Sequence, residues 1–175
     1  SKKINNHIYY DYSNLIQGMG IDEAWIDLSR RGITIEDGER TAHEIRNRVK
    51  EETGLSVSIG VSFNMSFAKL ASEVKKPDAV TVISKDNFKN VAWPLPVSDL
   101  LYVGTQTTKK MHSYGIRTIG ALALTNPEFI RGHFGKVGIM LWQMANGLEN
   151  APVRDISFEE DSKSIGNSTT TARDI

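Results

Sequence analysis

Apolar and polar residues follow two different patterns in the first 90 residues. Strict alternation predicts a β-strand over residues 55–61, and the apolar run at 80–83 predicts a second, buried strand. A strand is also expected over 21–28, after a glycine-rich turn, with a helical lead-in over 1–16. Because helical patterns separate these strands, the region is predicted to have an α+β fold.

Two helices are expected between the strands. The first runs over residues 39–53, with Asp37 as its cap and Gly54 at its end. The second opens at Asn64 and is stopped by Pro77. The predicted buried positions of the two helices are Ala42, Ile45, Val49, Phe67, Leu70, Ala71 and Val74.

The pattern changes near Pro94 and Pro96, which predict a linker. Short helical stretches separated by glycine or polar turns follow it. They are expected at 97–101, 107–114, 119–123, 127–134 and 139–145. The predicted organisation is an α+β part over 1–92, a small all-α part over 93–155, and a polar connector with a first strand over 156–175.

Composition narrows the possible chemistry. The 175 residues include no cysteine, which excludes disulfides, thiolate metal sites and thiol catalysis. No apolar run approaches the roughly 20 residues needed to cross a bilayer, so we expect no membrane partner. A cysteine-free chain suits the reducing cytosol, and the expected location is cytoplasmic, with the protein as a monomer. The net charge of zero argues against a DNA-coating protein, yet residues 101–155 carry 6 basic and 3 acidic groups.

The adjacent carboxylates Asp22 and Glu23 are the first candidate site. Neighbouring strand residues point to opposite faces, so the pair can serve one site only where the pleat is interrupted, which Gly18 and Gly20 permit. Two converging carboxylates repel each other unless a cation lies between them, and Mg²⁺ prefers such oxygen ligands. Taken alone, the pair is more often a solvated surface feature.

Basic residues at turns are the second set of candidates. Lys76 follows a predicted helix and could present its ammonium to a phosphate, although a charge that complements the helix dipole is the commoner role. The turn before residue 105 would aim free backbone N–H groups outward, as at a DNA phosphate site. A helix hairpin with no ligand is the alternative interpretation. The candidate DNA-binding residues are Val103, Gly104, Thr105, Lys109, Lys110 and Lys136.

The order of these motifs resembles the Y-family DNA polymerases, the ImpB/MucB/SamB (UmuC-domain) group of lesion-bypass enzymes. The resemblance covers nearly the whole chain. Its motifs are residues 20–27 (GIDEAWID), 58–64 (SIGVSFN), 68–72 (AKLAS), 76–77 (KP), 95–97 (LPV), 103–104 (VG) and 115–120 (GIRTIG). Tyr102 departs from the family pattern, because it replaces the first glycine of the usual hairpin turn.

The resemblance implies roles for the candidates. The α+β part would be a partial polymerase palm, with a mixed or antiparallel sheet and two helices, and the all-α part a thumb with helix-hairpin-helix-like turns. Asp22 and Glu23 would be catalytic, as two of three carboxylates that hold two Mg²⁺ ions, and Lys76 would contact the incoming triphosphate. The third carboxylate, the fingers and a C-terminal DNA-binding domain would lie outside residues 1–175.

The predicted function is therefore that of part of a DNA-directed DNA polymerase in translesion synthesis, a nucleotidyltransferase of DNA repair and the DNA damage response. Its partners would be primer–template DNA and deoxynucleoside triphosphates, with a sliding clamp contacted through segments outside this chain. The fragment alone is expected to be inactive. A non-catalytic helix-hairpin-helix DNA-binding module is the main alternative, and a nucleotide cyclase-like domain ranks below it.

Overall fold

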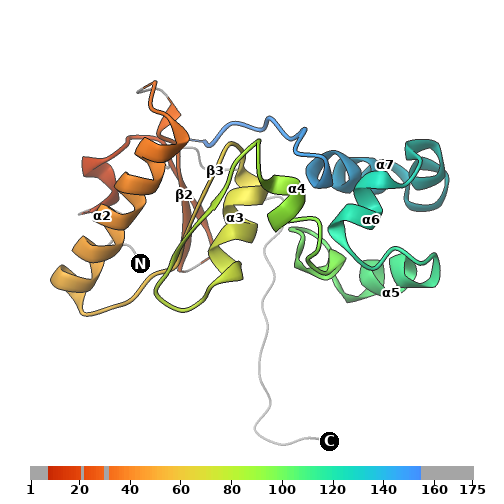
Figure 1. Cartoon of the computed structure of the whole chain (residues 1–175), viewed down its shortest axis with the longest axis horizontal. Coiled ribbons are helices and arrows are strands. Elements are labelled where there is room, and N and C mark those ends of the chain that lie inside the picture. Colours follow the sequence, from red (N-terminus) through yellow and green to blue (C-terminus); the bar gives the residue numbers. More distant parts are fainter. Residues whose placement is uncertain (1–7, 21, 30–31, 155–175) are drawn as a thin grey trace, which may run out of the picture.

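The computed structural model describes residues 8–20, 22–29 and 32–154, and Figure 1 shows their arrangement. An α/β layer, residues 8–92, is followed by a helical region, residues 93–147. The elements of the α/β layer are η1 (Tyr9–Asp11), β1 (Ile16–Met19), β2 (Glu23–Ile26), α2 (Ile35–Thr53), β3 (Ile59–Ser62), α3 (Met65–Val74), β4 (Val80–Ile83) and α4 (Phe88–Val91). Those of the helical region are η3 (Val97–Asp99), α5 (Thr105–Ser113), α6 (Ile119–Leu124) and α7 (Pro127–Ala145). The expected α+β architecture is confirmed.

The strands form two separate pairs. β1 and β2 pair antiparallel, whereas β3 and β4 pair parallel. β1 corrects the expected helical lead-in, because only η1 is helical among residues 8–16 and residues 1–7 lie outside the described residues. The reason is local: Leu15 and Ile16 are buried, and Ile16 lies opposite Ile26 in the hairpin.

α2 begins four residues earlier than expected. Thr34 is its N-cap and accepts a hydrogen bond from the Asp37 amide at 3.2 Å, while the Asp37 carboxylate accepts one from the Thr34 amide at 3.1 Å. Asp37 is therefore the second member of a capping box, and its prediction as the cap itself was wrong. The predicted end at Gly54, with φ 71°, is confirmed.

α3 lies closely against β3. Its predicted cap is confirmed, since the Asn64 side chain accepts from the Phe67 amide at 2.9 Å. A side chain at Gly60 in β3 would meet the backbone of α3, with its Cβ only 2.6 Å from the Ser72 nitrogen. Two predictions here need correction: β3 begins at Ile59 instead of residue 55, and Val74 is exposed.

The proline-containing segment between the two regions is packed in place. The Trp93 indole donates to the Ala145 carbonyl at 3.0 Å, and the Ile119 amide donates to the Leu95 carbonyl at 3.0 Å. One hydrophobic cluster includes Phe67 of α3 and Met144 of α7. The two regions therefore share a core at their junction, and the division of the chain at residue 93 stays a prediction.

α7 consists of two helical segments joined at a turn. Gly135 has φ 62° and ψ −151°, which no helical residue adopts. The turn matches the glycine break expected between residues 127–134 and 139–145. Among the residues that the structure describes, no helix is both long and apolar enough to cross a membrane.

Gly60→Ala tests the contact between β3 and α3. The added methyl group would have to displace the helix backbone, so we expect the free energy of unfolding to fall by about 3 kcal/mol in urea denaturation. Gly18→Ala is the control, because a Cβ there meets no atom within 4 Å. Equal decreases in the two variants would contradict the assigned contact.

Candidate functional site

The carboxylate pair lies where the β1–β2 turn enters β2. Asp22 is an exposed turn residue, and Glu23 opens the strand opposite Met19. Gly20 has φ 68°, a backbone conformation that glycine adopts without strain. The pleat is thus interrupted just before Glu23, which meets the condition under which two adjacent carboxylates can serve one site.

Four charged side chains form an ion-pair chain that begins at Glu23. Lys69 Nζ lies 2.7 Å from Glu23 Oε1 and 2.6 Å from Glu73 Oε1. Lys76 Nζ lies 2.7 Å from the same Glu73 oxygen. The structure thereby links two predicted site residues, Glu23 and Lys76, through two that the sequence analysis did not single out.

Both inner members of this ion-pair chain are held in their charged forms. Burial lowers the pKa of Lys69, but hydrogen bonds to Glu23 and Glu73 outweigh burial and raise it above its usual value. Hydrogen bonds from Lys69 and Lys76 lower the pKa of Glu73. Opposite charges therefore alternate along the ion-pair chain at neutral pH.

α3 is fixed against one face of β2. Glu23 and Trp25 are two residues apart in the strand and so share a face. Trp25 donates its indole N–H to the Met65 carbonyl at 3.0 Å, and Lys69, one helical turn further along α3, reaches Glu23. The two contacts set the position of α3 relative to the carboxylate pair.

The loop that carries Lys76 is tied to α2. Asp78, with φ 53°, lies 2.8 Å from Lys50 Nζ and 3.6 Å from Arg46 Nε. Both cations belong to α2, so a second helix holds the residues just after Lys76 in place.

The donor set at Glu23 suits part of a magnesium site. Carboxylate oxygens are the ligands that Mg²⁺ prefers, and the Lys69 ammonium already lies against one of them as a stand-in cation. Within the described ranges, no cluster of three or more acidic, histidine or cysteine side chains could hold a metal ion by itself. The role of Asp22 and Glu23 as ligands of such an ion therefore stays a prediction.

The predicted DNA-binding turn lies between η3 and α5. Tyr102 has φ 68° although it is not glycine, and its side chain is exposed, whereas Val103 is buried. Gly104, the N-cap of α5, has an extended backbone and no side chain that could accept a hydrogen bond. The first N–H groups of the helix, starting at Thr105, therefore have no acceptor on the side chain of the cap residue.

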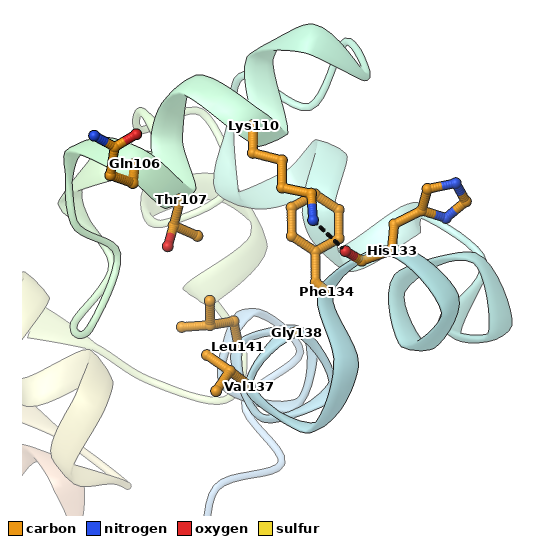
Figure 2. Close-up of a pocket in the computed structure, with 8 residues that line it drawn as sticks. All are labelled: Gln106, Thr107, Lys110, His133, Phe134, Val137, Gly138 and Leu141. Atoms are coloured by element: carbon orange, nitrogen blue, oxygen red, sulfur yellow. Dashed lines mark hydrogen bonds between the residues drawn. The ribbon is translucent and has the colours of Figure 1, made fainter.

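The predicted lysines lie along α5 and at the turn in α7. Figure 2 shows Lys110 with its Nζ donating to the His133 carbonyl at 2.6 Å, and this atom lies 5.1 Å from the Phe134 ring centre. Lys109 and Lys136 are exposed. A hollow of about 290 Å³ is lined by residues of α5 and α7. Among the six predicted DNA-binding residues, all of which the structure describes, only Lys110 lines this hollow.

Comparison with known proteins gives the family context. Residues 1–73 match the sequence model of the impB/mucB/samB family. The chain is 47% identical to a DNA polymerase IV of Acetivibrio thermocellus over 173 residues, which are 99% of this chain and 43% of that protein. It is 36% identical to DNA polymerase IV 1 of Bacillus subtilis, covering 95% of this chain and 40% of the relative.

Solved structures show the same fold. A Y-family DNA polymerase chimera superposes with a TM-score of 0.80 at 22% identity, over 90% of this chain and 46% of the chimera. DinB from Sulfolobus solfataricus gives 0.78 at 22% identity, over 88% and 46%. The chain is related to the Y-family DNA polymerases. The resemblance predicted from the sequence is confirmed.

The relationship to Y-family polymerases covers part of those enzymes. The chain spans less than half the length of the relatives described above. The family match at 1–73 includes Asp22, Glu23, Lys69 and Glu73, and it ends before Lys76 and the helical region. Roles for the individual residues therefore remain predictions from geometry and sequence pattern.

The anchoring of the Lys76 loop predicts a pH dependence of stability. A hydrogen bond from Lys50 lowers the pKa of Asp78; burial opposes this effect, and the charges of Lys50 and Arg46 add to it. A lowered folded-state pKa contributes stability above the ordinary value of about 3.9, and that stability disappears as the pH falls further. Asp78→Asn should flatten the acid limb of stability below about pH 4.

The measurement is urea unfolding across this pH range. Lys50→Met should flatten the same limb, because it removes the main cause of the lowered pKa. Glu51→Gln, the adjacent residue on α2, is the control and should keep the wild-type profile. Identical profiles for wild type and Asp78→Asn would contradict the assignment.

Proposed function

We propose that this chain supplies the carboxylate pair, the triphosphate-contacting lysine and the DNA-backbone grip of a DNA-directed DNA polymerase that performs translesion synthesis. The observation that carries the proposal is the ion-pair chain, which joins Glu23 to Lys76 across α3. The Lys69 ammonium already lies against the Glu23 carboxylate, and the Lys76 ammonium lies in the loop just after the same helix. This arrangement suits a reaction in which metal ions and a polyphosphate meet.

In the proposed reaction, Asp22 and Glu23 hold divalent ions with their carboxylate oxygens. When bound, two Mg²⁺ ions supply activation of the primer 3′-hydroxyl and neutralisation of the triphosphate and leaving pyrophosphate. The turn at Gly20 interrupts the pleat before Asp22, and the pairing with Met19 holds the backbone of Glu23 in the hairpin. These two features support an ion site shared by the two carboxylates.

Lys76 would orient the triphosphate. Its side chain is half exposed, with a relative accessibility of 50%, so its ammonium can turn from Glu73 to a phosphate oxygen. An ammonium on a flexible stem suits a phosphate that must enter and leave. The ion pairs of Asp78 with Lys50 and Arg46 of α2 hold the loop backbone in place while the Lys76 side chain moves.

The helical region would bind the DNA backbone. The open N-terminus of α5 presents N–H groups at Thr105, and the positive end of the helix dipole favours a phosphate there. Lys110 supplies charge at the hollow between α5 and α7, and the exposed Lys109 and Lys136 add charge to the same two helices. These contacts would position the duplex without reading its sequence.

We further propose that the polymerase acts in the cytoplasm, as a monomer, in DNA repair. It would contact a sliding clamp through segments outside residues 1–175. Residues 1–175 by themselves are proposed not to extend primers, because the carboxylate pair supplies only two of the carboxylates that the reaction requires.

Asp22→Ala and Glu23→Ala test the catalytic assignment in the polymerase that contains this chain. Each change removes an ion ligand, so we expect primer extension with Mg²⁺ to fall at least about a thousandfold. Duplex binding, measured by fluorescence anisotropy, should change less than about twofold. Asp86→Ala is a matched control outside the ion-pair chain. Near-normal turnover in either variant would favour a DNA-binding module without catalysis.

Lys109→Gln and Lys110→Gln test the DNA grip. Removing one lysine that binds a phosphate should reduce the slope of log affinity against log salt concentration by about 0.9. We expect the double variant to flatten the slope by up to about 2, with Lys85→Gln in the α/β layer as control. An unchanged slope in the double variant would remove the helical region from the DNA interface.

A further inference from the structure

Lys69 is the centre of the one ion-pair chain in the described residues that reaches the carboxylate pair. Its ammonium bridges Glu23 of β2 and Glu73 of its own helix, at 2.7 Å and 2.6 Å. Its side chain is only 21% exposed. A lysine held this firmly at the predicted ion site is not accounted for by a helix-surface role.

The geometry requires a competition at Glu23. The Glu23 oxygen that accepts from Lys69 at 2.7 Å already has one cation against it. Two like charges at one carboxylate also repel each other. Binding of a divalent ion to Glu23 would therefore weaken the Lys69–Glu23 ion pair, and the ion pair would weaken binding of the ion.

Glu73 lowers the free-energy cost of displacing Lys69 from Glu23. An ammonium displaced from Glu23 keeps its bond to Glu73, one helical turn away on α3, so it is not left as an unpaired, partly buried charge. The two residues are spaced i and i+4, the spacing at which a helix brings such side chains together.

We propose that Lys69 is a positioning residue, an internal counter-ion that neutralises Glu23 until a divalent ion is bound and then moves fully onto Glu73. This inference rests on the proposed ion-ligand role of Glu23. It has a consequence at the other end of the ion-pair chain. Lys76 shares the same Glu73 oxygen, so a stronger Lys69–Glu73 pair weakens the hold on Lys76 and frees it for the triphosphate.

The test is direct Mn²⁺ binding to the polymerase that contains this chain, without nucleotide or DNA, followed by the electron paramagnetic resonance signal of the free ion. Lys69→Met removes the competing ammonium and should tighten Mn²⁺ binding about fivefold. Lys69→Arg keeps the positive charge and should stay within about twofold of wild type. A merely structural lysine would give weaker binding, or no change, on substitution.

A matched variant separates direct competition from general charge. Lys76→Met removes the same charge from the same ion-pair chain, but Lys76 does not touch Glu23, so its effect should stay below about twofold. If Lys69→Met tightens binding no more than Lys76→Met does, the inference is wrong. Circular dichroism checks the folding of each variant, and Lys69→Gln replaces Lys69→Met if the latter does not fold.

Glu23→Gln distinguishes failure of the inference from failure of the proposed function. If Glu23→Gln leaves Mn²⁺ affinity unchanged, Glu23 is not an ion ligand and the proposed function fails at this residue. If Glu23→Gln weakens binding while Lys69→Met does not tighten it, only the counter-ion role fails. In the double variant, the Lys69→Met effect should disappear, because its partner carboxylate is gone.

Discussion

The close approach of α3 to β3 at Gly60 determines where the functional side chains lie. Only a residue without a Cβ lets the helix backbone come this near to the strand. At that distance, Met65 meets Trp25 and Lys69 meets Glu23. A helix held further out would leave the carboxylate pair without its cation and would move the Lys76 loop away from it.

Periodicity predicted α2 and α3 well because most of each predicted stripe is buried, whereas the four-residue α4 was not predicted. Ala42, Ile45 and Val49 are buried on α2, as are Phe67, Leu70 and Ala71 on α3. β1 was missed because it has only four residues and contains Gly18, so it shows no clear alternation. Its formation depends on pairing with β2, which a local pattern cannot reveal.

Prediction of the site was uneven for a similar reason. Asp22, Glu23 and Lys76 are recognisable from motifs, but no motif predicts that Lys69 spans 46 residues of sequence to reach Glu23. The spacing of Lys69 and Glu73 was a usable signal, because residues four apart in a helix lie on one face, and Lys76 follows just after the helix ends. What the sequence could not provide was the neighbouring strand, since that contact depends on how α3 packs against the sheet.

The end of the helical region returns to the start of α3. A Cβ added at Gly147 would lie only 3.1 Å from the nearest atoms of both the Phe63 and the Phe67 rings. The Glu149 carboxylate accepts a hydrogen bond from the Ser66 amide at 2.9 Å. Close-packed interiors deform little under load. This packing couples the two regions mechanically: a displacement of the end of the helical region would be transmitted to the start of α3, the helix that carries Lys69.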